Sequence, residues 1–427
     1  MWSVGHRRVT SITPRRAIDI NIDGCVIASI DVSIERGRRR SSSSVVVRRR
    51  QCPSFVSYRT FAATAPSTST SRARARGARP WTPVSAVAVA RRVLVALALT
   101  CVARAWCRGG AMSSAAVGGG SGAGAGAGAA AVSRARAVSK TVLSREQSEG
   151  RGARVRRSIG NAQVRNFDPF LMLDEFAVGL PAGFSDHPHR GMITCTYVLP
   201  KSRGFMDHED SMLNAGRLRA GDLQYMKAGR GILHAEVPTS EDVCHGLQLW
   251  ITLPAAHKMD EPEYQELRAE ELSRASWDGV DAIIIAGEAF GVQSQVSTKE
   301  TPVHYIHFAM APGSELTQKV PPGWNSFAYT LEGSADFGDG VLIGPHHTVM
   351  FTNRDGEDGV IVKAGPSERA EFVLISGQPV GEPIEQHGPF VMNTREEINR
   401  AFADFQGAKN GFESARGWRS EIQYRIR

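Results

Sequence analysis

The chain has 427 residues, of which 42% are hydrophobic, so it has room for two or three domains and can bury a substantial core in at least part of its length. Its net charge of +8 combines two unlike segments: residues 1–145 hold 24 basic and 4 acidic residues, and residues 146–427 hold 27 basic and 39 acidic. Residues 146–427, whose sequence is typical of a folded protein, therefore have a net charge of −12, which argues against direct contact with nucleic acid.

Residues 1–137 are expected to form a disordered extension rich in Arg, Ser and Ala, with RRR at 38–40 and 48–50 and no acidic residue between 36 and 145. This composition is typical of organelle transit peptides and predicts a plastid or mitochondrial location. The alternative is an untranslated or merely disordered stretch, with Met112 as the true start. The nucleus or cytoplasm is then expected, and an Arg run would serve as a nuclear import signal if retained.

Three features of the first half are excluded as functional sites. The apolar run at 84–102 is interrupted by Arg91 and Arg92 and is too short for a membrane span. The run GGGSGAGAGAGAAA at 118–131 is expected to be a flexible linker, because no strand precedes its GxGxxG pattern. The six cysteines show no CxxC pair, and Cys195 and Cys244 are expected to be buried free thiols.

From residue 138 onward, short apolar runs alternate with turn residues, which is typical of an all-β protein whose strands close into sandwiches or barrels. Thr394 and Glu397 form a capping box, and Ile398, Phe402 and Phe405 follow at helical spacing. One short helix is therefore predicted at 395–406. The expected strands include 192–199, 221–226, 246–253, 282–286, 303–309, 326–331, 349–352 and 371–376.

Two pairs of possible metal ligands lie about 45 positions apart. His187 and His189 belong to DHPHRG (186–191), and His234 and Glu236 belong to GRGILHAE (229–236). Residues two apart on a strand share a face, so both pairs can point into one barrel. Three imidazoles and one carboxylate suit Fe(II), Mn, Ni or Cu(II), and they leave one or two positions open for water, O2 or a chelating substrate. A single strand histidine is more often a hydrogen-bonded core or surface residue, but two such pairs favour the metal site.

The remaining histidines of the strand-rich region predict no second site. His208 lies in the polar stretch DHED, which is expected to be a loop in which His208 is solvent-exposed or makes a turn hydrogen bond. His304 and His307 are three apart on a strand and should face opposite sides, and the adjacent His346 and His347 cannot both point inward.

Long blocks of the chain resemble the pirin family from about residue 138 to the C-terminus. The blocks are SREQSEGRGARVRRSIG (144–160), DPFLMLDEF (168–176), DHPHRG (186–191), GDLQYMKAGRGILHAE (221–236), HGLQLWITL (245–253), YQELRAEEL (264–272), PPGWNSFAYTLEG (321–333) and QHGPFVMNTREEI (386–398). In one place the chain departs from the family, which often has an aromatic residue and then Glu after HPHRG, where this chain has Met192 and Ile193.

The resemblance implies two stacked cupin-type β-barrels, a bicupin, with metal in the first barrel (138–262) and none in the second (263–427). It assigns the four metal ligands to His187, His189, His234 and Glu236. Fe2+ is the expected ion, with Mn, Ni, Cu and Zn as alternatives, and a monomer is expected.

The resemblance also implies two functions of different class. Some pirins are quercetin 2,3-dioxygenases, which would require a small aromatic substrate, O2, Glu236 as the catalytic base and a dry pocket for which Met226 and Leu233 are candidates. Others act as iron-dependent, redox-sensing co-regulators, which would require a protein partner such as a transcription factor.

Overall fold

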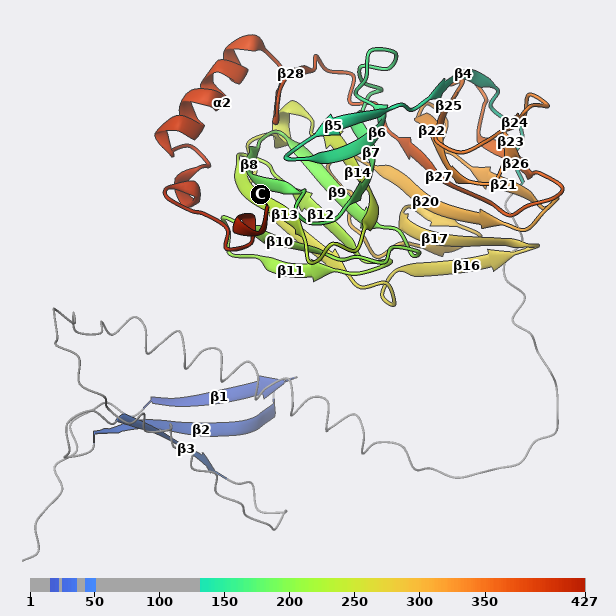
Figure 1. Cartoon of the computed structure of the whole chain (residues 1–427). Helices are drawn as coiled ribbons and strands as arrows, with labels where there is room; N and C mark the ends of the chain where they lie inside the picture. The colour runs from blue at the N-terminus through green and yellow to red at the C-terminus, as the bar shows by residue number, and fades with distance from the viewer. Residues whose placement is uncertain (1–15, 23–24, 37–42, 51–130, 427) are drawn as a thin grey trace, which may run out of the picture. The chain divides into compact units, whose positions relative to one another are not determined.

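The computed structural model describes residues 131–426 and, upstream of them, the backbone of 16–22, 25–36 and 43–50 (Figure 1). The chain divides into two compact units, 1–116 and 117–427, each considered by itself. In the first unit, β1 (Arg16–Ile22), β2 (Cys25–Arg36) and β3 (Ser43–Arg50) form an antiparallel sheet. These strands coincide with β-branched runs such as VVV. The apolar run and the linker up to residue 130 lie outside the described residues.

The second unit is built from two antiparallel β-barrels, each with a seven-stranded and a four-stranded sheet. In the first barrel, the four-stranded sheet runs β11 (Ala215–Leu218), β10 (Met206–Asp210), β13 (Ile232–Pro238), β8 (Phe184–His189). Its seven-stranded sheet runs β15 (Glu263–Leu267), β12 (Leu223–Lys227), β9 (Met192–Val198), β14 (Cys244–Thr252), β7 (Phe170–Val178), β6 (Ala153–Ile159), β5 (Glu146–Glu149).

The second barrel repeats this plan, and its strands lie beside those of the first barrel in Figure 1. Its seven-stranded sheet runs β16 (Ser273–Trp277), β17 (Val280–Ala286), β20 (Val303–Met310), β27 (Ala370–Gly377), β22 (Asn325–Glu332), β25 (His347–Phe351), β4 (Val138–Leu143). Its four-stranded sheet runs β21 (Glu315–Lys319), β26 (Gly359–Ala364), β23 (Ala335–Asp336), β24 (Leu342–Ile343). The expected all-β fold of two stacked cupin-type barrels is thus confirmed.

Two strands cross the predicted domain boundary. β4, at the start of the segment 138–262, pairs with β25 in the second barrel, and β15, after residue 262, pairs with β12 in the first. The division at 262/263 stays a prediction, since each barrel borrows an edge strand from the other segment. A shared strand covers an otherwise open sheet edge and links the barrels through backbone hydrogen bonds.

The alternation of side chains along the strands creates two different interiors. In β9, Cys195 and Tyr197 face the large apolar core between the barrels, so Thr194 and Thr196 face into the first barrel. The second barrel is instead filled by apolar side chains such as Phe308 and Phe372, each at most 1% exposed. Cys195 and Cys244 are buried free thiols, as predicted.

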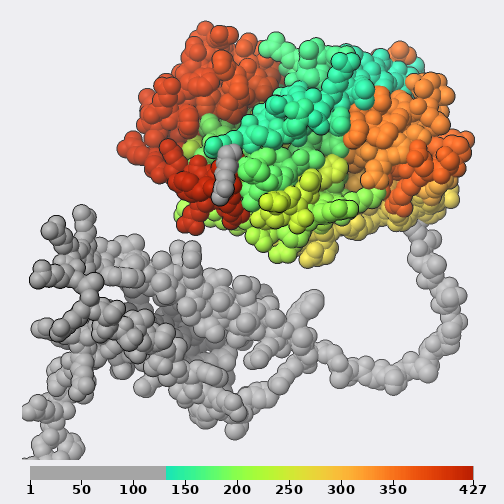
Figure 2. Space-filling model, viewed as in Figure 1, coloured from blue at the N-terminus to red at the C-terminus, as the bar shows by residue number. Residues whose placement is uncertain are grey.

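The C-terminal segment leaves the second barrel and covers the first. It contains the ribbon β28 (Glu385–His387) and β29 (Phe390–Met392), the helix α2 (Arg395–Gly407), and the short 3-10 turns η2 (Glu413–Ala415) and η3 (Ile422–Arg425). Figure 2 shows this segment, in red, lying against the green strands of the first barrel.

The predicted helix and its capping box are confirmed. The Glu397 backbone N–H donates to Thr394 Oγ1 at 3.2 Å, and the Thr394 N–H donates to the Glu397 carboxylate at 3.0 Å. Ile398, Phe402 and Phe405 pack in the cluster that holds the helix to the first barrel. No helix in the described part of the chain is long and apolar enough to cross a membrane.

Three short elements complete the connections: the ribbon of β18 (Glu288–Ala289) and β19 (Val292–Gln293), and the 3-10 turn η1 (Ala255–His257).

Candidate metal centre

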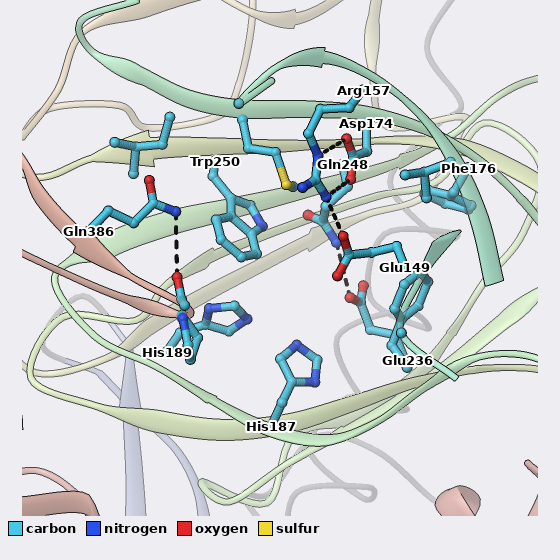
Figure 3. Close-up of a pocket in the computed structure, with 18 of the residues that line it drawn as sticks. Glu149, Arg157, Asp174, Phe176, His187, His189, Glu236, Gln248, Trp250 and Gln386 are labelled. Atoms are coloured by element: carbon cyan, nitrogen blue, oxygen red, sulfur yellow. Dashed lines mark hydrogen bonds and ion pairs between the residues drawn. The ribbon is translucent and has the colours of Figure 1, made fainter. Parts of the chain in front are cut away.

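Three histidines converge on one wall of the first barrel. His187 and His189 lie on β8, and His234 lies opposite His187 on the neighbouring strand β13. The Nε2 atom of His234 is 2.9 Å from that of His187 and 3.0 Å from that of His189. Figure 3 shows His187 and His189 side by side at the edge of the pocket. The two i,i+2 positions on β8 thus share a face, as their spacing predicted.

The spacing and protonation of these imidazoles fit a transition metal. Two nitrogens bound at about 2.1 Å on adjacent octahedral positions lie about 3.0 Å apart, which matches the observed separations. Burial, and then the charge of His187, lowers the pKa of His189 and of His234 well below the usual value. Both rings are therefore neutral at pH 7, which is the form that binds a metal. Within residues 131–426, these three histidines form a group whose possible ligand atoms all lie within 4.8 Å of one another.

Glu236 lies in the same cavity, but its carboxylate is held by the opposite sheet. Its Oε1 accepts a hydrogen bond from Thr196 Oγ1 at 2.7 Å, and its Oε2 accepts one from Gln248 Nε2 at 3.0 Å. The pairing of β13 with β8 is irregular between His234 and Glu236. The possible ligand atoms that lie close together are those of the three histidines. Glu236 as a fourth ligand stays a prediction.

His187, His189 and Glu236 line a cavity of about 720 Å³. Phe176, Phe184 and Trp250 supply aromatic walls, and the Trp250 ring packs edge-on against His189 with centroids 5.1 Å apart. The expectation that Met226 and Leu233 line the pocket is wrong. Met226, on β12, packs with Ile232 and Tyr264, and Leu233 packs against the C-terminal segment.

A row of polar side chains crosses the inner face of the seven-stranded sheet. Gln224, Thr196, Gln248, Asp174 and Arg157 are consecutive cross-strand partners on β12, β9, β14, β7 and β6. Sequence reasoning missed this row. In the sequence, the row is indicated by polar residues at alternate positions of otherwise apolar strands. Only the register of the paired strands shows that five of these positions align.

The row ends in a charged cluster on the pocket wall. Arg157 donates to Asp174 Oδ1 through Nε at 2.8 Å and to Asp174 Oδ2 through Nη2 at 2.7 Å. Nη2 also donates to Glu149 Oε2 at 2.6 Å. The hydrogen bonds to Asp174 raise the pKa of Arg157 above its usual value despite burial, so its guanidinium stays charged.

The comparisons with known proteins bear on this site directly. The Pirin family model matches residues 152–251, and the model described as Pirin C-terminal cupin domain matches 305–411. Over 289 residues the chain is 53% identical to the human protein named Pirin, across 67% of this chain and 97% of that one. The chain belongs to the pirin family.

Further relatives extend the similarity across kingdoms. A tomato (Solanum lycopersicum) pirin-like protein is 50% identical over 286 residues, which cover 66% of this chain and 96% of that one. Among solved structures, quercetin 2,3-dioxygenase from Acinetobacter baumannii is similar, with a TM-score of 0.59 and 29% identity. The similarity covers 65% of this chain and 99% of that chain.

The two residues that depart from the pirin pattern, Met192 and Ile193, lie in the core and do not line the pocket. Met192 is fully buried beside Leu171 and Val391, and Ile193 lies in the core between the barrels. Neither side chain lines the cavity. The replacement therefore changes the packing behind β8 and β9 in this pirin rather than the surface that faces a ligand.

His208 corrects another expectation. It lies in β10 and is 2% exposed, with Nε2 3.0 Å from both Glu266 Oε2 and the Tyr264 hydroxyl. The stretch DHED looked like a loop because all four residues are polar. In a strand, however, His208 faces the barrel while Asp207 faces outward and pairs with Arg217.

The other histidines behave as predicted. His307 contacts the Tyr197 hydroxyl at 3.1 Å in the core between the barrels, whereas His304, on the other face, packs edge-on against Trp324. His346 contacts Glu175 through Nδ1 at 2.7 Å, and its neighbour His347 contacts backbone carbonyls.

The two strands that carry the histidines of this pirin are also braced from outside. Arg190, which follows His189, donates to the Arg230 carbonyl at 2.6 Å, to Asp404 of α2 at 2.9 Å and to the Asn410 carbonyl at 2.7 Å. Arg230 precedes His234 on the chain by four residues, so one guanidinium ties β8, the approach to β13 and the C-terminal segment together.

Proposed function

We propose that the chain is a metal-dependent oxygenase of the quercetin 2,3-dioxygenase type, acting on flavonol-like aromatic substrates with O2. The observation that carries the proposal is the convergence of three imidazoles beside a cavity with aromatic walls, which His187 and His189 line. The similarity to the Acinetobacter baumannii quercetin 2,3-dioxygenase, which extends over nearly all of that chain, supports the same class of substrate.

Fe2+ is the proposed ion, with Mn, Ni, Cu and Zn as alternatives. His187, His189 and His234 would hold it, with Glu236 as the proposed fourth ligand. When bound, the ion supplies Lewis-acid polarisation of chelating substrate oxygens and a template that brings substrate and O2 together.

Glu236 is the proposed catalytic base. Its carboxylate faces the cavity and would accept the proton of the flavonol hydroxyl group that chelates at the histidines. The Thr196 and Gln248 side chains donate to its two oxygens and fix its orientation. Phe176 and Trp250 would contact the faces of an aromatic substrate and keep water away from the reacting atoms.

The test is oxygen uptake by the full chain with quercetin, after loading with each metal. We expect turnover by the wild type and at least a hundredfold loss in His187→Ala and His234→Ala, together with loss of bound metal. His257→Ala is the matched control, because His257 is half-exposed on η1, pairs with Asp260 and does not line the cavity.

Glu236→Gln separates the role of base from that of ligand. A variant that keeps stoichiometric metal but loses turnover supports a base, whereas loss of both supports a ligand. If the wild type binds metal but consumes no O2 with any flavonol, the oxygenase proposal is wrong. That outcome selects the alternative, an iron-dependent co-regulator that binds a protein partner.

A further inference from the structure

The cavity has a second polar point on the side away from the histidines. Glu149 and Arg157 both line it, and Figure 3 shows them across the pocket from His187 and His189. Arg157 is on β6, two strands from Gln248 on β14, which holds Glu236. Since neighbouring strands lie about 4.8 Å apart, Arg157 begins about 10 Å from Gln248 along the sheet. A ligand of two or three aromatic rings can bridge this distance.

Both side chains keep hydrogen-bonding capacity for a ligand. Arg157 uses Nε and Nη2 for its carboxylate partners, while Nη1 makes no hydrogen bond to the described residues and is not buried. Glu149 uses only Oε2, and within 131–426 its Oε1 has no hydrogen-bond donor. The Glu149 side chain is 41% exposed. The pair therefore offers one free donor beside one free acceptor.

Charge decides which group fits this pair. Arg157 carries one positive charge and is held by two carboxylates, Asp174 and Glu149, so the cluster has a net charge of −1. A carboxylate on the ligand would be repelled by Glu149. A neutral hydroxyl group can accept from Arg157 Nη1 and donate to Glu149 Oε1 at the same time. An ether oxygen could only accept, and would leave Glu149 desolvated without a donor.

The position of Glu149 is fixed by the local fold. It is the last residue of β5, and the turn that follows begins with Gly150 at φ +55°. A Cβ atom on Gly150 would lie 2.7 Å from the Phe184 ring, so the turn packs closely against β8, the strand that carries His187 and His189. The two ends of the cavity are thus held at a fixed separation.

We propose that Glu149 and Arg157 recognise a phenolic hydroxyl group at the end of the substrate away from the chelating oxygens. The proposal rests on the function proposed above and narrows its substrate class to aromatic chelators that carry a distal, neutral phenol. Arg157 and Glu149 are then specificity-determining residues, and the chelating oxygens alone do not define the substrate.

The test measures equilibrium binding by the metal-loaded full chain without O2, so that no turnover is needed. The probes are 3-hydroxyflavone, 3,7-dihydroxyflavone, 3,4′-dihydroxyflavone, and the methyl ether of each distal hydroxyl group. We expect one of the two dihydroxyflavones to bind about tenfold more tightly than 3-hydroxyflavone and than its own ether. In Glu149→Ala this preference should fall to about onefold.

Arg157→Lys is the second variant, because it keeps the charge beside Asp174 but loses the planar fork. It should also lose the preference for the phenol. Glu146→Gln is the matched control, since Glu146 pairs with Arg154 on the same β5–β6 hairpin and does not line the cavity. This variant should keep the full preference.

The outcomes separate this proposal from the function on which it rests. If all flavonols bind the wild type with equal affinity, or if Glu149→Ala keeps the preference, the recognition proposal is wrong while a flavonol site stands. If no flavonol binds the metal-loaded wild type, both proposals are wrong.

Discussion

Gly191 lies where the chain leaves β8, the strand that carries His187 and His189, and meets the C-terminal segment. Its backbone has φ +77°, and a Cβ atom there would lie 1.9 Å from the Val391 carbonyl oxygen. Gly191 thus combines a left-handed backbone conformation with close approach to a second backbone segment. It also follows Arg190, whose side chain pairs with Asp404 of α2. Only glycine meets both demands.

Gly191→Ala should therefore destabilise the protein by about 3 kcal/mol or more, since backbone strain adds to a steric clash. Gly313→Ala is the control, because Gly313 has a similar φ of +72° but nothing within 4 Å of its Cβ position. Gly313→Ala should lower the free energy of unfolding by only about 1 kcal/mol. Urea denaturation of both variants measures the difference, and equal costs would contradict the role given to the Val391 contact.

At the scale of elements, the C-terminal segment acts as a brace for β8 and β13. The Arg190 side chain is only 2% exposed, and it pairs with Asp404 of α2 and covers the Phe412 ring at 4.7 Å. A buried charge pair contributes modestly while intact, but removal of one partner leaves the other charge desolvated. The segment is therefore held on the first barrel by a contact that tolerates little change.

Arg190→Met should lower the free energy of unfolding by about 3 kcal/mol or more, because Asp404 loses its partner. Arg230→Met should cost less than about 1 kcal/mol, because the Arg230 side chain is 37% exposed and pairs with exposed Glu261 and Glu413. Chemical denaturation of the metal-free proteins compares the two. A similar loss in both variants would show that the buried pair has no special weight.

Sequence reasoning predicted elements better than their partners. The alternation in MITCTYV and the capping box at Thr394 depend on neighbours in sequence. The predicted ends of this strand and of the capped helix lie within a residue or two of the observed ends. The pairing of β4 with β25 joins residues about 200 positions apart, which no local pattern encodes. The same limit hid His208 and the polar row, because only the register shows that these residues face the site.

At the scale of the whole molecule, a buried carboxylate links the two barrels. Glu175 on β7 accepts a hydrogen bond from the Tyr329 hydroxyl of the second barrel at 2.7 Å, and it contacts His245 at 2.8 Å and His346 at 2.7 Å. Burial raises the pKa of Glu175, but the hydrogen bonds with His245 and Tyr329 and the charge of His346 outweigh it and lower the pKa overall.

A lowered pKa in the folded state fixes the sign of the pH dependence. The stabilisation by Glu175 is present above the unfolded pKa of about 4.3 and is lost as the pH falls through the lower folded-state pKa. Glu175→Gln should be less stable than wild type by about 1–3 kcal/mol at pH 6, and this gap should shrink below about pH 4. Thermal unfolding between pH 3 and pH 7 measures it.

Glu332→Gln is the control for this prediction, because Glu332 also lies near the junction of the barrels but is half-exposed in its pair with Lys201. Its stability curve should run parallel to that of the wild type. A gap for Glu175→Gln that stays constant down to pH 3 would contradict the linkage.

The exchange of β4 and β15 also bears on biosynthesis. As the chain leaves the ribosome, β4 emerges first but has no strand to pair with until β25 has been made about 200 residues later. α2 and the residues that brace β8 emerge later still. The second barrel therefore cannot complete its seven-stranded sheet until β25 and β27 have been made, whereas every strand of the first barrel, β15 included, is available once residue 267 has been made. The three histidines can thus come together before the segment that braces their strands exists.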